Sequence, residues 1–147
     1  MSKSNAFENA WLLHVFNNAG IANIGDATGL RGSVTAGSLY VSLHTADPGE
    51  AGDQSTSEVA YTGYARVPAA RSALGWTVTG NSVSPTSNID FGQRTNSGAG
   101  ITVTFFGVGT SSSGAGMLLY SGTVTGMPDI VQNSIPRLTT ASTITED

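Results

Sequence analysis

The stretch SLYVSLHTADPGEAGDQSTSEVAYTGYARV, residues 38–67, decides the fold, because it holds two strand-like runs joined by a long acidic loop. Over residues 38–44, apolar side chains alternate with more polar ones, which is the period of a strand with one face on a core. Residues 59–67 are rich in β-branched and aromatic side chains, so we expect them to lie in a sheet near the first strand. Between the two runs, Pro48-Gly49 and Gly52-Asp53 supply turn chemistry, and a loop of this length indicates more than a simple connection.

Length and composition limit the classes of protein that the chain can form. At 147 residues it can bury a core of its own, and we expect residues 1–147 to form a single β-rich domain. The absence of cysteine excludes disulfides, thiolate metal ligands and a cysteine nucleophile. No apolar run approaches the roughly 18 residues of a membrane-spanning helix, and the first residues do not lead into a signal-peptide core. We therefore expect no contact with a membrane.

The charge inventory argues against nucleic acid as a partner. The chain has six basic and ten acidic residues, a formal net charge of -4. Phosphate contacts need clustered Lys or Arg, and the basic residues here are few and dispersed. Low charge on a β-rich protein also favours edge-to-edge pairing of strands. We therefore expect protein partners, including further copies of the same chain.

Residues 5–18 form the one segment with a clear helical period, since apolar residues recur at intervals of four. The members of this stripe are Phe7, Trp11 and Val15, with Leu12 and Phe16 beside them. Asn5 and Glu8 resemble a capping box, in which Glu8 faces away from the stripe, and Gly20 is a natural terminator. Two placements stay open. The stripe docks on the sheet of its own subunit, which we favour, or it lies on a neighbouring molecule as an interface arm.

The remainder of the chain predicts short strands separated by turns. After a loop at residues 21–37 and the stretch described above, the strand-like runs are residues 69–72, 76–79, 83–85, 88–91, 101–108, 117–120, 123–125 and 137–145. The continuous apolarity of residues 117–120 indicates burial on both faces. Strands at intervals of about ten residues are typical of all-β folds. We therefore predict a mainly β protein, a single-domain antiparallel β-sandwich or jelly-roll with one N-terminal amphipathic helix.

Candidate catalytic chemistry is confined to His44 at the mouth of the acidic loop. His44-Thr45-Ala46-Asp47 places a carboxylate where it could orient the imidazole, as a general base requires. The sequence lacks a G-x-S-x-G nucleophile elbow, and Ser111-Ser112-Ser113 lacks the strand-turn-helix context of one. We favour a structural role for His44, a hydrogen bond to Asp47 or to the loop backbone, and predict no catalytic residue and no enzyme.

The acidic loop also raises the question of a metal ion. Asp47, Glu50, Asp53 and Glu58 bring four carboxylates into one loop, and calcium prefers oxygen ligands of this kind. Their spacing does not match an EF-hand, whose ligands alternate along twelve residues and close on a glutamate. We expect a solvated acidic loop, and we predict no metal site and no cofactor.

Several motifs resemble a family of small structural proteins of tailed bacteriophages. They are LHTADPGEAGDQ (43–54), EVAYTGYARV (58–67), GWTVTGN (75–81) and TITED (143–147), with ANIGDATGL (22–30) and FFGVGTSSSGAG (105–116) adding to the likeness. The resemblance covers nearly the whole chain, and only residues 85–100 and 127–138 depart from the pattern. It implies a phage structural protein of the head-decoration (cement) or tail-fibre kind, with a jelly-roll-like fold and no catalytic residues.

The resemblance and the composition together lead to a functional expectation. We expect a capsid decoration protein that binds the outside of the major capsid protein shell and stabilises it. The alternative is a tail tube, tail tip or tail-fibre-associated protein. Both place the chain in the virion, on the capsid exterior in the first reading, after synthesis in the host cytoplasm. The side chains that we expect at an interface are Phe7, Trp11, His44, Asp47, Tyr61, Tyr64 and Trp76.

Overall fold

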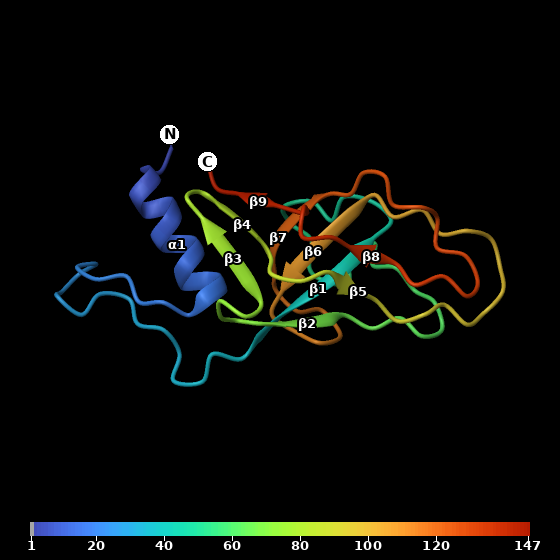
Figure 1. The fold of residues 1–147 in the computed structure, drawn as a ribbon, viewed down its shortest axis with the longest axis horizontal. Helices are drawn as coiled ribbons and strands as arrows, with labels where there is room; N and C mark the ends of the chain where they lie inside the picture. Colours follow the sequence, from blue (N-terminus) through green and yellow to red (C-terminus); the bar gives the residue numbers. More distant parts are fainter. Residues whose placement is uncertain (1) are drawn as a thin grey trace. The chain divides into compact units, whose positions relative to one another are not determined.

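The computed structural model describes residues 2–147, which form one helix and nine short strands (Figure 1). Their bounds are α1 Asn5–Asn17, β1 Ser38–His44, β2 Val67–Ala70, β3 Trp76–Thr79, β4 Ser82–Pro85, β5 Ile89–Asp90, β6 Phe105–Gly109, β7 Leu118–Thr123, β8 Arg137–Leu138 and β9 Ile144–Thr145. The strands form sheets of order β2-β1-β6-β7, β3-β4-β9 and β5-β8. The prediction of a mainly antiparallel β protein with one N-terminal helix is confirmed.

The chain divides into two compact units. The helical unit contains the residues up to Ser38, Ala69–Ser87 and Thr139–Asp147. The sheet unit contains Leu39–Pro68 and Asn88–Leu138. Each has buried apolar residues of its own. The single domain over residues 1–147 stays a prediction.

In the helical unit, α1 packs on the hairpin formed by β3 and β4. Leu12 and Phe16 of the helix are fully buried, and the ring of Phe16 meets that of Trp76 edge to face, with centroids 4.8 Å apart. Such an aromatic pair adds stability beyond the area that it buries. Leu12 and Phe16 therefore pack on the chain's own sheet, as favoured. Phe7 is exposed and Trp11 and Val15 are only half-buried, so the buried face is Glu8, Leu12 and Phe16, and not the stripe of Phe7, Trp11 and Val15.

The ends of α1 differ from the sequence prediction. The N-cap is Ser4, whose hydroxyl accepts from the Phe7 N–H at 3.4 Å, so Asn5 and Glu8 do not form a capping box. Glu8 is buried, although the sequence pattern placed it on the face away from the stripe. The helix ends at Asn18 in the left-handed conformation, with φ of 59°, so the chain leaves the helix before Gly20. Asparagine tolerates this conformation better than most residues, and the prediction overlooked it.

In the sheet unit, β1 and β6 pair antiparallel, with Ser42 opposite Gly107 and Leu43 opposite Phe106. The bounds of β1 confirm the predicted strand. Its second half is buried on both faces, because Ser42 and His44 are as inaccessible as Leu43. The prediction of a strand with one buried face is therefore correct only for the first half of β1.

Several of the predicted strands are wrong or shifted. The run expected at residues 69–72 lies at Val67–Ala70 (β2), and residues 123–125 add only Thr123, the end of β7. Residues 59–66 contain no strand, because Gly63 turns the chain with φ of 104° and the Tyr64 N–H donates to Tyr61 O. The apolar run at residues 101–108 becomes a strand only from Phe105 onward. Residues 118–120 are half exposed and Met117 is exposed, because β7 is the last strand of its sheet and is covered on one edge only.

Among residues 2–147, no helix has the length and apolar character that crossing a membrane requires.

Candidate functional site

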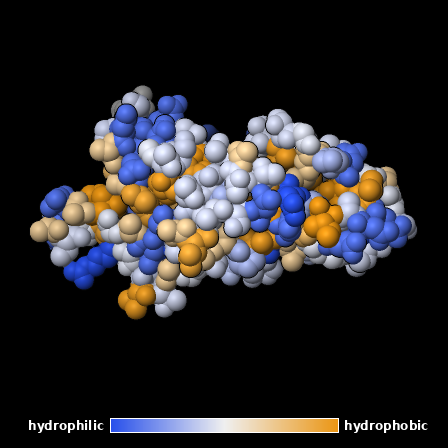
Figure 2. Space-filling model, viewed as in Figure 1, coloured by the Kyte–Doolittle hydropathy of each residue, from blue (hydrophilic) through white to orange (hydrophobic). Residues whose placement is uncertain are grey.

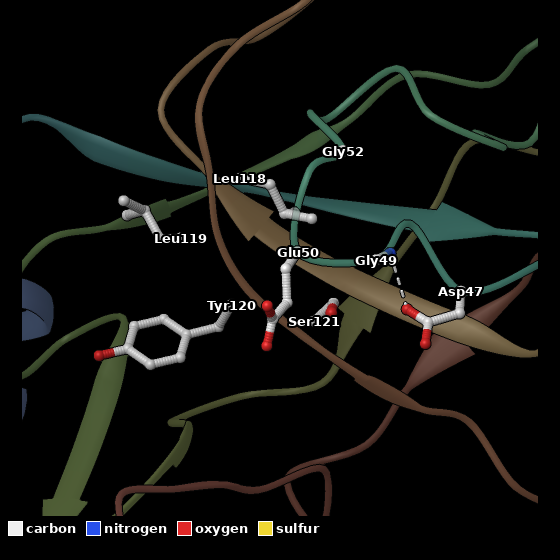
Figure 3. Close-up of a pocket in the computed structure, with 8 residues that line it drawn as sticks. All are labelled: Asp47, Gly49, Glu50, Gly52, Leu118, Leu119, Tyr120 and Ser121. Atoms are coloured by element: carbon white, nitrogen blue, oxygen red, sulfur yellow. Dashed lines mark hydrogen bonds between the residues drawn. The ribbon is translucent and has the colours of Figure 1, made fainter.

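A hollow of about 400 Å³ opens beside β7 in the sheet unit. One wall is the loop that follows β1, and the other is β7 itself (Figure 3). The lining residues are Asp47, Gly49, Glu50, Gly52, Leu118, Leu119, Tyr120 and Ser121, and we call this site the acidic hollow. Figure 3 shows the Glu50 side chain reaching from the loop over β7, with Tyr120 and Ser121 on either side. The site thus presents carboxylates beside half-exposed apolar side chains.

The loop wall of the acidic hollow is a tight turn that the sequence specifies. The Asp47 carboxylate accepts from the Gly49 N–H at 2.9 Å, and the Gly52 N–H donates to Gly49 O at 3.2 Å. Gly49 has φ of 68°, a conformation that glycine adopts without steric cost. The turn chemistry predicted at Pro48-Gly49 is therefore present, and it places Glu50 over β7.

Gln54 fastens the loop to the turn between β6 and β7. Its side chain is fully buried, and the side-chain Oε1 accepts from the Ser111 N–H at 2.8 Å. The Gln54 backbone N–H donates to Gly116 O at 3.0 Å. A Cβ on Gly109 would lie 2.2 Å from the Gln54 Cδ, so only glycine leaves room for this side chain. The sequence reasoning missed Gln54. The glycines at 109 and 116 were the available signal.

The β7 wall contains an irregularity that spreads its side chains. Val108 pairs with Tyr120 and Gly109 pairs with Leu118, so Leu119 is an extra residue in a β-bulge. Bulges bend a strand and change the direction of nearby side chains. As a result Leu118, Leu119 and Tyr120 are all half exposed.

Behind the loop, a buried ion pair joins its far end to two other segments. The Arg66 guanidinium donates to both oxygens of the Glu58 carboxylate at 2.7 Å, and it also donates to Ser111 O and Gly114 O at 3.0 and 2.8 Å. The Tyr64 hydroxyl donates to Glu58 at 2.9 Å and accepts from the Leu43 N–H at 3.1 Å. Burial raises the pKa of Tyr64, so the hydroxyl keeps its proton as a donor. This network fixes the loop against β1 and residues 111–114.

His44 lies inside this scaffold and is fully buried. Its Nδ1 is 2.8 Å from Thr56 O, and its Nε2 is 2.8 Å from the Ser42 hydroxyl. A carbonyl can only accept, so Nδ1 carries the proton and Nε2 accepts from Ser42. The predicted hydrogen bond to the loop backbone is thus confirmed. The prediction that Asp47 orients His44 is wrong, because the Asp47 carboxylate accepts from the Gly49 N–H.

The burial of His44 predicts a dependence of stability on pH. Desolvation lowers the pKa of His44 below its ordinary 6.5, so the unfolded chain binds the proton more readily than the folded chain. The free energy of unfolding should decrease as pH falls below about 7, through about 6.5 and on towards the lower pKa of the folded chain, and this contribution should be constant above about 7.5. Urea denaturation at a series of pH values measures it. His44→Gln should flatten the curve in this window. An equal slope in wild type and His44→Gln would contradict the assignment.

The other expected interface residues lie in different surroundings. Asp47 lines the acidic hollow, and Tyr61 and Tyr64 are partly buried, with rings 5.4 Å apart. Phe7 is exposed on α1, with the ring of Trp11 6.3 Å away. Trp76 and His44 are buried within their units and present no surface to a partner.

The acidic residues of the loop do not converge. Asp53 accepts from Ser55, which lowers its pKa, and Glu58 is paired with Arg66. No group of three or more His, Asp or Glu side chains in residues 2–147 is placed to hold a metal ion. The four carboxylates are therefore divided between turns, an ion pair and the acidic hollow.

Comparison with known families gives a match that covers most of the chain. A family model described as "Podophage GP4 fiber I protein gp80" matches residues 2–145. No curated protein and no solved structure matches the chain.

Proposed function

We propose that this chain, which belongs to the podophage GP4 fiber I protein gp80 family, is a structural subunit of a fiber on a phage particle. The observation that carries the proposal is the extent of the family match, which spans residues 2–145 of 147. Membership identifies the chain as a phage structural protein, in agreement with the sequence resemblance. A place in the virion follows from the same membership.

The finer expectation of capsid decoration has less support than its alternative. The family description names a fiber, which agrees with the tail-fibre reading and makes no mention of the head. The major capsid protein as a partner, and a position on the capsid exterior, stay predictions. The absence of enzymatic activity is also a prediction.

The surface of the sheet unit suits an assembly role. Its acidic hollow is bordered by an edge strand, and edge strands offer unpaired backbone groups to another chain. The sequence is poor in charge, with 11% charged residues, so most contacts with neighbours would be apolar or between uncharged polar groups. Such surfaces favour permanent contacts between structural subunits.

The location of the chain on purified particles tests the proposal. Antibodies raised against the purified chain and carrying gold should label the fibers under the electron microscope and leave the head bare. Quantitative mass spectrometry of the same particles should give a copy number well below that of the shell subunit. Gold over the whole head, with a copy number near that of the shell, would replace the proposal by capsid decoration. Particles without the chain would contradict both.

A further inference from the structure

The segment between α1 and β1, residues 21–37, is held in a fixed conformation although it contains no helix or strand (Figure 1). Asn18 bonds both backbone groups of Ser33, accepting from its N–H at 2.6 Å and donating to its carbonyl at 2.8 Å. Arg71 donates from Nη1 to the Ser33 hydroxyl and from its backbone N–H to Gly37 O. We call this segment the arm. Its order is set before any partner arrives, so docking it would cost little conformational entropy.

The arm exposes apolar side chains next to a free positive charge. Val34 is fully exposed, and Ile24 and Leu30 are exposed to 41% and 37%. Figure 2 shows hydrophobic and strongly hydrophilic residues side by side over the segment that follows α1. Arg31 is exposed and follows Leu30 directly.

Arg31 differs from the other basic residues of the chain. The other five bond to carboxylates or to backbone carbonyls, namely Lys3, Arg66, Arg71, Arg94 and Arg137. Arg31 has no such partner within residues 2–147. Its charge is therefore available to a partner from outside the described chain.

The acidic hollow offers the complementary set of groups. Asp47 and Glu50 supply negative charge, and Leu118 and Leu119 supply half-exposed apolar surface. No charged residue occurs in residues 101–126, so the β7 side carries no positive charge to oppose an incoming arginine.

The edge of β7 adds a backbone template to the acidic hollow. The Val124 N–H donates to Thr104 O at 2.8 Å, and Gly122 pairs with Phe106 in the same register. Backbone groups alternate in direction along an antiparallel ladder, so those of Ser121 and Thr123 point away from β6. An extended segment that enters the hollow can hydrogen-bond along this edge.

We propose that the acidic hollow of one copy receives the arm of a second copy of this chain, with Arg31 against Asp47 and Glu50 and with Val34 against the apolar wall. The inference rests on the proposed function, since a fiber subunit has to bind its neighbours. The two surfaces are different parts of the chain, so one copy can give its arm to one neighbour and receive the arm of another, which makes a heterologous contact. Heterologous contacts extend into open chains or close into rings, as a fiber component requires.

Charge exchange tests the proposal. Sedimentation velocity of the purified full chain over a series of concentrations should show that the wild type self-associates. This association should weaken as the salt concentration is raised. Arg31→Glu and Glu50→Lys should each weaken association by roughly tenfold or more. The double variant should regain most of the wild-type affinity, because it restores an oppositely charged pair.

Two matched controls separate this contact from general effects. Asp147→Lys makes the same change of charge as Glu50→Lys at the exposed C-terminus, and Leu74→Asp matches Val34→Asp at another strongly exposed apolar residue. Both controls should associate like wild type, whereas Val34→Asp should not. A monomeric wild type, or a double variant no better than the single ones, would overturn the inference.

The outcome is independent of the location experiment. Gold on the fibers, together with self-association that Arg31→Glu and Glu50→Lys leave unchanged, would refute the docking and support the fiber role. Restored association in the double variant, with particles that lack the chain, would refute the fiber role and leave the docking.

Discussion

Glu58→Gln is expected to destabilise the protein by about 3 to 5 kcal/mol, because it leaves the Arg66 guanidinium buried without its counter-charge. The Arg66 side chain is only 2% exposed and that of Glu58 is 17% exposed, so water cannot replace the lost carboxylate. Glutamine keeps the shape and one acceptor. The loss of stability therefore measures the contribution of the charge and of the second acceptor, because the side-chain volume is unchanged.

A second ion pair in the same unit is the matched control. Arg137 pairs through Nε and Nη2 with both oxygens of Asp90, but the two side chains are 54% and 47% exposed. Exposed pairs contribute about 0 to 1 kcal/mol, so Asp90→Asn, the same chemical change, should have little effect.

Urea denaturation of the four chains, wild type, Glu58→Gln, Asp90→Asn and Glu58→Gln/Arg66→Met, measures both effects. The double variant should be more stable than Glu58→Gln alone, because it removes the orphaned charge. Equal losses for Glu58→Gln and Asp90→Asn would show that burial of the pair does not govern its contribution.

Regular elements with strong local patterns were predictable from the sequence. β1 and β3 have the predicted bounds, because alternation over 38–44 and 76–79 is a local signal that the tertiary structure does not override. The existence of α1 was equally clear from its apolar stripe. Its N-cap was misassigned because Ser4 and Asn5 are both good caps, and only the geometry decides between them.

Residues 59–66 show where local propensity fails. Their β-branched and aromatic content predicted a strand, yet β-propensity describes fitness for a pleated, half-buried surface more than a backbone preference. Here the Tyr64 and Tyr61 hydroxyls bond to Glu58 and to Gly92 O. Gly92 lies 31 residues from Tyr61, so that contact comes from the tertiary structure and no local window of sequence contains it.

The acidic hollow was half predictable. Asp47 and the turn at Pro48-Gly49 carry a local signal, so the loop wall was anticipated. The β7 wall was not predictable, because an apolar run predicts a buried strand. Only the strand order shows that β7 lies at the edge of its sheet. Gln54 escaped for the same reason, since its burial depends on glycines more than 50 residues away.

The second large effect concerns Gly63, inside the motif YTGYARV. Its φ is 104°, and a Cβ there would lie 2.1 Å from Gln93 O, while a Cβ on Gly92 would lie 1.8 Å from Gly63 O. The two backbone segments therefore touch directly. A backbone carbonyl cannot rotate away as a side chain can, so the contact admits no residue larger than glycine.

Gly63→Ala should combine backbone strain with this clash and destabilise the protein by about 3 to 5 kcal/mol. Gly126→Ala separates the two terms, because Gly126 has a similar positive φ of 75° and open space around its Cα. It should cost only about 1 kcal/mol, the strain alone. Thermal and urea unfolding of both variants measure the difference. Equal losses would mean that the segments at 63 and 92 move apart freely, and that the close approach does not help to hold Tyr61 and Tyr64 in place.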